Sequence, residues 1–308
     1  MLSTLGIHQS VEAVFPPEAL REALSGIEPD VRIVSTDDLD GCEALVTFAY
    51  DERFLGSGIE WIHSIQAGVD RFPFDRLETE SVSLTNSTGI HGDTVGETVA
   101  GYMLSFARGL HRYRDRQNDA EWSREAWDRP FSLADSSVCV VGLGTLGRGV
   151  ATRSNAFGMD TVGVKRTPTP VDGVETVYPS RELESAISGA KFVALTVPLT
   201  PETEGLIGAD ELEAMRSDAI VINVARGPVV DEPALVEALE SGTIGGAALD
   251  VFETEPLPEE SPLWGMENVI VTPHVAAATG AYYRRIAALV RENVHRYTDG
   301  AELTNRVV

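Results

Sequence analysis

The stretch Ser137-Val138-Cys139-Val140-Val141-Gly142-Leu143-Gly144-Thr145-Leu146-Gly147 decides the fold of this 308-residue chain. Its first half is an apolar run of β-forming residues, which is typical of a parallel strand buried on both faces. Three glycines spaced G-x-G-x-x-G follow, and then a helix-like stretch over Leu146–Phe157. In a strand-turn-helix unit these glycines permit a tight turn, close approach of backbone to a pyrophosphate, and close packing of helix on strand. We therefore predict a dinucleotide site formed by Gly142, Leu143, Gly144, Thr145, Leu146 and Gly147.

Strand-like and helix-like runs alternate on both sides of this glycine loop, and the chain is long enough for two domains. The runs before it are Thr4–Ile7, Val31–Val34, Ala44–Phe48, Trp61–Ile65 and Val82–Thr85. Those after it are Met159–Lys165, Phe192–Val197, Ala219–Val224, Ile244–Leu249 and Val269–Thr272. A long helix that links the domains is predicted from Gly92 onward by the spacing of Val95, Val99, Met103, Phe106 and Leu110.

The charge of the chain is strongly acidic, with 48 Asp and Glu against 24 Lys and Arg and a formal net charge of -24. This balance argues against nucleic acids and anionic membranes as partners. Lys165 and Lys191 are the only lysines, and the other basic residues are arginines. Excess acid with scarce lysine suggests a halophilic protein, and an ordinary acidic cytosolic protein is the alternative.

Cys42 and Cys139 both lie in apolar runs, which suggests buried thiols in a reducing compartment rather than a disulfide. The first residues lack the pattern of a signal peptide, and no run of 18 apolar residues occurs. We expect a cytoplasmic protein without a metal site.

Several loops after the predicted strands carry chemically distinctive side chains, and in a doubly wound sheet such loops lie along the edge where ligands bind. Arg226 precedes Gly227 and offers a rigid fork suited to a carboxylate, although an ion pair with Asp231 is an alternative. His274 is a candidate acid-base group, and Glu255 is placed to support it. The other histidines, His8, His63, His91, His111 and His295, are expected to be structural or solvated.

These motifs together resemble the D-2-hydroxyacid dehydrogenase family, in the branch of glyoxylate and hydroxypyruvate reductases. The resemblance covers nearly all of the chain after about residue 60. Besides the glycine loop it rests on Ala67-Gly68-Val69-Asp70, Pro198-Leu199-Thr200-Pro201-Glu202-Thr203, Asn223-Val224-Ala225-Arg226-Gly227, Asp250-Val251-Phe252-Glu253-Thr254-Glu255-Pro256-Leu257-Pro258 and Thr272-Pro273-His274-Val275-Ala276.

The resemblance implies an α/β fold with two doubly wound parallel-sheet domains, a Rossmann dinucleotide-binding domain inserted in a smaller flavodoxin-like substrate domain. The implied bounds are 1–91 for the first part of the substrate domain, 92–274 for the dinucleotide-binding domain and 275–308 for the returning segment. It also implies a homodimer. The segment 111–130, which carries Trp122 and Trp127 among Arg and Asp residues, is either a subunit interface or a charged surface helix.

The resemblance also implies the reaction: NAD(P)H-dependent reduction of a 2-keto acid to a D-2-hydroxy acid, and the reverse. Arg226 would bind the substrate carboxylate and carbonyl, His274 would be the general acid/base, and Glu255 would steady His274. The backbone of Ala67, Gly68 and Val69 would also hold the carboxylate, and Asp250 would lie near the nicotinamide. Further cofactor contacts are expected at Val197, Pro198, Thr203, Val224 and Ala225.

One family feature is absent. Family members that use NAD end the second strand of the nucleotide fold with an acidic residue, which binds the ribose. This chain has Lys165, Arg166 and Thr167 there, so we predict a preference for NADP(H), with some use of NAD(H). The substrate itself is left open. Phe48, Ala49 and Tyr50 are candidates to line its side chain and favour an apolar keto acid over glyoxylate.

Two alternatives remain from the sequence. Related proteins of this fold act as dinucleotide-sensing corepressors, against which the full Arg-Glu-His set speaks. A phosphoglycerate dehydrogenase-like enzyme is the other, but residues 1–90 contain no clear basic cluster for a phosphate.

Overall fold

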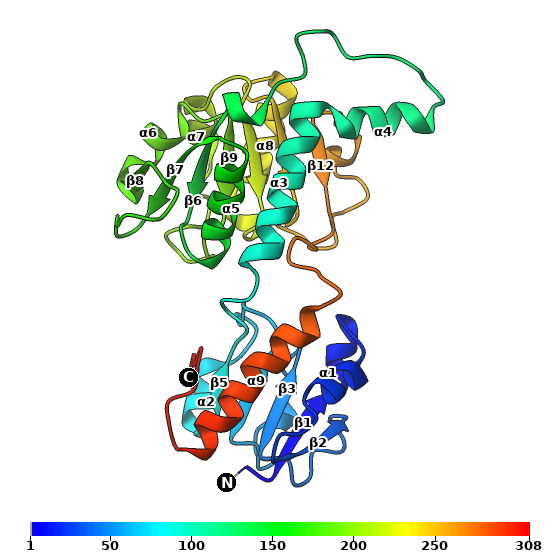
Figure 1. The fold of residues 1–308 in the computed structure, drawn as a ribbon, viewed down its shortest axis with the longest axis vertical. Helices are drawn as coiled ribbons and strands as arrows, with labels where there is room; N and C mark the ends of the chain where they lie inside the picture. The colour runs from blue at the N-terminus through cyan, green and yellow to red at the C-terminus, as the bar shows by residue number, and fades with distance from the viewer. Residues whose placement is uncertain (1) are drawn as a thin grey trace. The chain divides into compact units, whose positions relative to one another are not determined.

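The computed structural model describes residues 2–308 and divides into two compact units. Unit 1 consists of the residues up to Ile90 together with Thr279–Val308, and unit 2 is His91–Ala278. Each unit is an α/β layer structure around its own parallel sheet, as the sequence predicts (Figure 1). None of the described helices is both long and apolar enough to cross a membrane.

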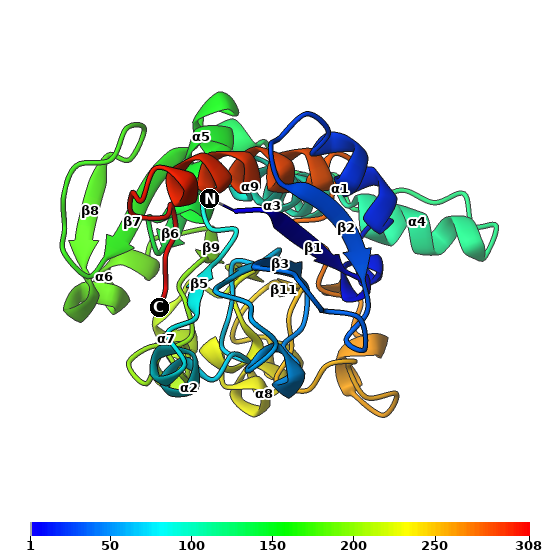
Figure 2. The same cartoon turned by 90° about the horizontal axis from the view of Figure 1, so that it is seen from below.

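Unit 1 contains a five-stranded parallel sheet with the order β2-β1-β3-β4-β5, the flavodoxin-like arrangement. Its strands are β1 (Thr4–His8), β2 (Asp30–Val34), β3 (Ala44–Thr47), β4 (Trp61–Ser64) and β5 (Ser83–Thr85). Helices α1 (Pro17–Ala23) and α9 (Tyr282–Thr298) cover one face, and α2 (Phe74–Thr79) lies on the other (Figure 2). The C-terminal helix α9 thus completes the core that the first 90 residues begin.

Unit 2 contains a seven-stranded parallel sheet with the order β12-β11-β10-β9-β6-β7-β8, which extends the Rossmann arrangement by one strand. Its strands are β6 (Ser137–Val141), β7 (Asp160–Lys165), β8 (Thr176–Pro179), β9 (Phe192–Leu195), β10 (Ile220–Asn223), β11 (Gly246–Leu249) and β12 (Val269–Val271). Helices α3 (Gly92–Arg108) and α5 (Thr145–Ala156) pack on one face. Helices α6 (Leu183–Ile187), α7 (Ala209–Ala214) and α8 (Glu232–Ser241) pack on the other. Strand β8 was not predicted, because this edge strand lacks the buried apolar run of its neighbours.

The long helix predicted from Gly92 is shorter than expected, because Leu110 does not belong to it. Gly109 adopts a left-handed conformation with φ of 64° and ends α3, and Leu110 begins a separate helix, α4 (Leu110–Asn118). Leu110 is 52% exposed, so its match to the apolar spacing was coincidental. Helix α4 and the loop that follows it project away from the sheet of unit 2 (Figure 1).

Candidate active site

The glycine loop connects β6 to the N-terminus of α5, and each of its three glycines meets a different physical demand. Gly142 turns the chain with φ of 97°. A Cβ on Gly147 would lie 1.9 Å from the carbonyl oxygen of Gly142, so this position tolerates no side chain. A Cβ on Gly144, in contrast, would meet no atom of the chain within 4 Å. The bare backbone of Gly144 at the start of a 12-residue helix fits the approach of a pyrophosphate.

The second strand of this unit, β7, ends in the basic pair that the sequence predicts to select the cofactor. Lys165 is half-buried and its Nζ donates to Oγ1 of Thr169 at 3.0 Å, while Arg166 and Thr167 are exposed. Glu202 lies on the neighbouring loop, and the pKa of its carboxyl is lowered first by a hydrogen bond from Thr200 and also by Arg166. Strand β7 thus ends in the basic pair Lys165 and Arg166, with one acidic residue, Glu202, on the neighbouring loop.

The loop after β9 is held in place by two hydroxyl groups. Thr203 Oγ1 donates to the carbonyl of Pro198 at 2.6 Å and accepts the N–H of Thr200 at 2.8 Å, so it closes the loop that contains Val197 and Pro198. Thr196, which is buried, donates to the carbonyl of Gly142 at 2.6 Å and so fixes the glycine turn. The contribution of Thr196 was missed from sequence because a threonine at a strand end is not distinctive.

Arg226 follows β10 on a turn that Asn223 holds from both sides. The side chain of Asn223 accepts the N–H of Ala225 at 3.1 Å and donates to the carbonyl of Arg226 at 3.0 Å. A Cβ on Gly227 would lie 1.9 Å from the carbonyl carbon of Phe252, so the two loops approach backbone to backbone. Arg226 itself is half-buried at the carboxyl edge, and Val224 and Ala225 beneath it are buried.

The alternative partner for Arg226, Asp231, has a structural task of its own. Its Oδ1 accepts the N–H of Ala234 at 3.0 Å, and it is therefore the N-cap of α8.

Asp250, which follows β11 and is 1% exposed, fixes the backbone of the His274 loop. Its carboxylate accepts the hydroxyl of Thr272 at 2.6 Å and the backbone N–H groups of Val275 at 2.9 Å and Ala276 at 2.8 Å. Its own carbonyl accepts the N–H of His274 at 2.8 Å. The buried carboxylate is thus paired with three donors, which offsets the cost of its burial.

Thr272 extends this network to helix α3. Since its hydroxyl hydrogen is given to Asp250, its oxygen accepts the hydroxyl of Tyr102. Burial raises the pKa of Tyr102 to about 12, so this phenol stays a donor. The link between Tyr102 and Thr272 joins residues 170 positions apart, and no local pattern in the sequence signals it.

His274 and Glu255 are brought together at the same carboxyl edge. The ring Nδ1 of His274 lies 2.8 Å from Oε2 of Glu255, and the two side chains are 50% and 39% exposed. The other carboxylate oxygen of Glu255 accepts the N–H of Phe252 at 3.2 Å, which orients the carboxylate. With Nδ1–H facing a carboxylate, Nε2 is the ring atom left to exchange a proton with a bound molecule. Arg226, Glu255 and His274 therefore stand on the loops of three adjacent strands, β10, β11 and β12.

The predicted substrate-binding residues of unit 1 lie after β3 and β4. Within the described residues, no acceptor receives the backbone N–H groups of Ala67, Gly68 and Val69, while the Ala67 carbonyl accepts Asn86 Nδ2 at 2.8 Å. Successive N–H groups of this kind suit an anion. The hydroxyl of Tyr50 is buried and makes no hydrogen bond with any described residue.

Comparison with known proteins gives a consistent result. The family model described as D-isomer specific 2-hydroxyacid dehydrogenase, NAD binding domain, matches residues 100–276. A protein of Yersinia pestis (strain Pestoides F) named glyoxylate/hydroxypyruvate reductase B is 32% identical over 293 residues, which cover 92% of this chain and 90% of that protein.

Solved structures agree over the whole length. A D-isomer specific 2-hydroxyacid dehydrogenase from Xanthobacter autotrophicus Py2, in complex with NADPH and MES, matches with a TM-score of 0.82 and 32% identity, covering 100% of this chain and 98% of that one. An NADPH-dependent glyoxylate/hydroxypyruvate reductase from Sinorhizobium meliloti, in complex with NADP and sulfate, matches with a TM-score of 0.82 and 28% identity, covering 99% and 98% of the two chains.

Proposed function

This chain belongs to the D-isomer specific 2-hydroxyacid dehydrogenase family, and from that premise we propose that it reduces glyoxylate and hydroxypyruvate with NADPH. As a member of the family it is an oxidoreductase that interconverts 2-keto acids and D-2-hydroxy acids with NAD(P)H. The choice of these two keto acids is supported by the names of its relatives in Yersinia and Sinorhizobium. The observation that carries the site assignment is the contact between His274 and Glu255 beside the Arg226 loop.

We assign one chemical task to each of these three side chains. His274 would give the proton at Nε2 to the keto oxygen. The cofactor, when bound, would supply the hydride that completes the conversion of the carbonyl to a hydroxyl. Glu255 accepts Nδ1–H, which orients the ring. Arg226 binds the substrate carboxylate through its planar fork. The backbone of Ala67, Gly68 and Val69 and the Tyr50 side chain remain the predicted substrate contacts of unit 1.

The experiment is a kinetic panel with NADPH and keto acids of increasing length, from glyoxylate and hydroxypyruvate to pyruvate and branched aliphatic acids. Highest catalytic efficiency with the first two supports the proposed substrates. Highest efficiency with a branched acid would instead support the expectation drawn from Phe48, Ala49 and Tyr50. Turnover of no 2-keto acid, with NADPH still bound, would favour a dinucleotide-sensing protein.

The role of Glu255 has its own test. Glu255→Gln removes the negative charge beside the ring but keeps an oxygen that accepts Nδ1–H. Because the amide holds the ring less firmly than the carboxylate does, kcat is expected to fall with NADPH affinity retained. An unchanged kcat would separate Glu255 from the task of His274.

We further propose that Lys165 and Arg166 bind the 2′-phosphate of NADPH. Support comes from their place at the end of β7, where an acid would repel the phosphate, and from the exposure of Arg166 and Thr167. One hydrogen bond to a charged group contributes about 1.5 to 3 kcal/mol, which corresponds to about tenfold to a hundredfold discrimination.

The test compares catalytic efficiency with NADPH and NADH in the parent and in a Lys165→Ala, Arg166→Asp double variant. The expected result is a loss of the NADPH preference with activity on NADH retained. The pair Lys191→Ala, Arg216→Asp, which removes the same charges elsewhere in unit 2, is the matched control. A parent that prefers NADH, or a ratio that the double variant leaves unchanged, contradicts the assignment.

We also propose that the segment 111–130, here called the arm, forms a homodimer interface. Helix α4 buries none of its residues within the chain, and Trp122 and Trp127 are 100% and 93% exposed. The segment after α4 is nevertheless anchored, because the Glu125 side chain, only 6% exposed, forms ion pairs with Arg112 at 3.3 Å and Arg116 at 2.8 Å. Exposed tryptophans on a segment that ion pairs hold in place are typical of an interface with another protein. An identical chain is the simplest partner.

Light scattering or sedimentation equilibrium measures the oligomeric state directly. The parent is expected to be a dimer and Trp122→Ser, Trp127→Ser a monomer. Trp264→Ser changes another exposed tryptophan of unit 2, which lies outside the arm, and is expected to leave the dimer intact. A parent that is monomeric at micromolar concentration contradicts the proposal.

Two further properties are proposed from composition. Adaptation to high salt is supported by the net charge of -24 and the near absence of lysine. A cytoplasmic location is supported by Cys42 and Cys139, which are both free and buried. Cell fractionation tests the location.

A further inference from the structure

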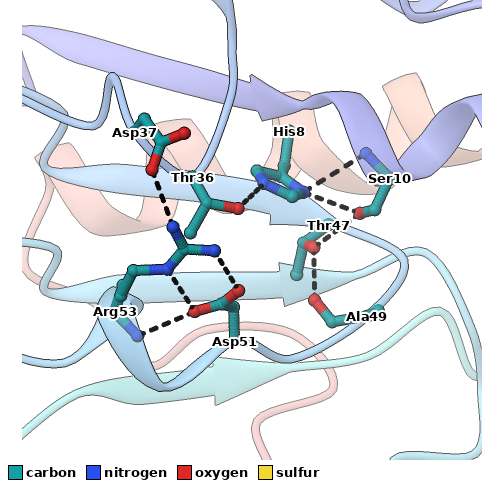
Figure 3. Close-up of polar contacts among 8 residues, drawn as sticks. All are labelled: His8, Ser10, Thr36, Asp37, Thr47, Ala49, Asp51 and Arg53. Atoms are coloured by element: carbon teal, nitrogen blue, oxygen red, sulfur yellow. Dashed lines mark hydrogen bonds and ion pairs between the residues drawn. The ribbon is translucent and has the colours of Figure 1, made fainter.

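A second polar cluster, outside the site described above, lies at the carboxyl ends of β1, β2 and β3 in unit 1 (Figure 3). His8 is the last residue of β1 and is 9% exposed, and Thr47 is the last residue of β3 and is fully buried. Ser10 lies between these two, and Thr36 follows β2. Buried side chains of this kind are kept only where their hydrogen bonds are satisfied.

The ring of His8 is held on both sides by neighbouring groups. The backbone N–H of Ser10 donates to Nδ1 at 3.2 Å. Nε2 lies 2.9 Å from the hydroxyl of Thr36. The imidazole is therefore fixed between Ser10 on one side and Thr36 on the other.

From His8 the contacts lead to the last residue of β3 and to the first two residues of the loop after it. The hydroxyl of Ser10 lies 2.8 Å from Nδ1 of His8, accepts the N–H of Phe48 at 3.1 Å and contacts the hydroxyl of Thr47 at 3.0 Å. Thr47 in turn donates to the carbonyl of Ala49 at 2.7 Å. Tyr50 is the next residue, so the network determines the path of the chain into it.

The charged groups around His8 are paired with each other. Asp51 and Arg53 form an ion pair at 2.8 Å, and Arg53 also contacts Asp37 at 2.7 Å (Figure 3). The hydrogen bond from Arg53 lowers the pKa of Asp51 to about 2, so Asp51 keeps its charge above that pH. Burial lowers the pKa of His8, and of the two charges Asp51 opposes this and Arg53 adds to it. The ring edge of Phe54, 5.2 Å away, closes the remaining side.

We propose that His8 is a positioning residue for the keto acid: through Ser10 it holds the loop Phe48–Tyr50 in place. This inference rests on the proposed function, because it takes Tyr50 as a residue that contacts the substrate. Without the imidazole, Ser10 loses the partner that fixes its hydroxyl against the N–H of Phe48. The affinity for the keto acid is then expected to fall, while the chemistry at His274 is not directly affected.

The first test measures KM and kcat for the keto acid in His8→Ala and His8→Asn. His8→Ala removes the partner of Ser10, so KM is expected to rise about fivefold with kcat little changed, the effect of losing roughly one hydrogen bond. His8→Asn offers a polar group near the position of Nδ1 and is expected to restore most of the affinity. His295→Ala, which changes an exposed histidine on α9, is the matched control and should behave as the parent. An unchanged KM in His8→Ala would overturn the proposal.

The second test uses Thr47 and does not depend on a variant at His8. Thr47→Val keeps the shape of the side chain but removes the hydroxyl that joins Ser10 to Ala49. It is expected to raise KM about fivefold even at neutral pH with kcat little changed. Thr47→Ser restores the hydroxyl and is expected to restore KM. An equal loss in Thr47→Val and Thr47→Ser would indicate that packing, rather than the hydroxyl, holds the loop.

A third measurement separates failure of this inference from failure of the proposed function. Hydrogen exchange of the Phe48 amide, compared between parent and His8→Ala, reports the order of the loop without any turnover. Faster exchange in the variant is expected, because the N–H of Phe48 donates to Ser10. Unchanged exchange overturns the inference whatever the activity, whereas faster exchange without any keto-acid reduction in the parent would overturn the proposed function alone.

Discussion

His274 illustrates how a single residue is held in a conformation it would not adopt alone. Its φ of 53° lies in the left-handed region, which costs a non-glycine residue about 1 to 3 kcal/mol. Asp250 compensates this cost, because its backbone carbonyl and its buried carboxylate together bind the N–H groups of residues 274, 275 and 276. The position of the imidazole is therefore set by the backbone before Glu255 orients its ring.

Replacement of His274 with Gln removes the proton donor but keeps the size and polarity of the side chain. Turnover is expected to fall about 10²- to 10⁴-fold, the usual contribution of a positioned general acid, with NADPH affinity retained. Steady-state kinetics and a fluorescence titration with NADPH measure the two effects. His295→Gln on the surface of α9 is the control, and near-normal turnover in His274→Gln would remove His274 from the mechanism.

Arg226→Lys keeps the charge but replaces a planar fork by a single ammonium group. If the fork binds the substrate carboxylate in a bidentate manner, catalytic efficiency should fall about tenfold to a hundredfold. Arg216→Lys provides the comparison, because Arg216 pairs with Asp218 on the surface of the same unit. Equal kinetics in parent and Arg226→Lys would favour a structural role for Arg226.

At the scale of the element, two glycines within four residues at the junction of β6 and α5 have different roles. Gly147 is required for packing, and we expect Gly144 to be required for binding the cofactor. Gly147→Ala places a Cβ against the carbonyl of Gly142 and is expected to destabilise the protein by about 1 to 3 kcal/mol or more. Gly144→Ala meets no atom of the chain and is expected to leave stability unchanged but to weaken NADPH binding. Thermal unfolding and NADPH titration measure both variants, and an equal loss of stability in the two would refute this division.

Strand β4 carries a fully buried histidine, His63, with a hydroxyl group beside each ring nitrogen. Ser87 gives its hydroxyl hydrogen to the carbonyl of Ser64, so it accepts Nε2–H of His63. Thr85, which accepts from Trp61, lies 2.9 Å from Nδ1 and supplies the other bond. Burial lowers the pKa of His63 to about 3.

Acid is therefore expected to destabilise unit 1 through His63. Below a pH of about 6.5 the unfolded chain binds a proton that the folded chain does not, so the free energy of unfolding falls by about 1.4 kcal/mol per pH unit as the pH decreases toward the lowered pKa. Urea unfolding monitored at Trp61, with the three exposed tryptophans changed to Phe, measures this slope. His63→Asn should reduce it, and an equal slope in parent and variant would contradict the assignment.

The sequence was informative where the determining residues are close together in the chain. The glycine spacing and the apolar strands locate the glycine turn, the sheet of unit 2 and the edge of that sheet at which the candidate active-site residues lie. The resemblance to a known family adds the roles of His274 and Glu255 as a pair. The links of Tyr102 to Thr272 and of His8 to Thr47 were not predictable, because each joins common residues far apart in sequence. Leu110 was wrongly assigned to the long helix, because the apolar spacing continues past Gly109, the residue at which α3 ends.

For the whole molecule, the dominant property is a net charge of -24 carried on the surface. Repulsion among these carboxylates opposes the compact state, and salt at about 1 M shortens its range to about 3 Å. The midpoint of thermal unfolding is expected to rise between about 0.1 M and 1 M KCl. An equimolar uncharged osmolyte series is the control, and equal midpoints at low and high KCl would contradict adaptation to salt.

The discontinuity of unit 1 has a consequence for how the chain is made. Strands β1 to β5 leave the ribosome before unit 2, but helix α9, which covers their core with Ile286 and Val290, is synthesised after it. Unit 2 is contiguous, so it is free to fold while unit 1 waits, for roughly 10 to 40 s at about 5 to 20 residues per second. During this interval the apolar face of the first sheet lacks its covering helix. We expect nascent chains of this protein to need a holding chaperone on that face, and expression to suffer when translation of the last third is slowed.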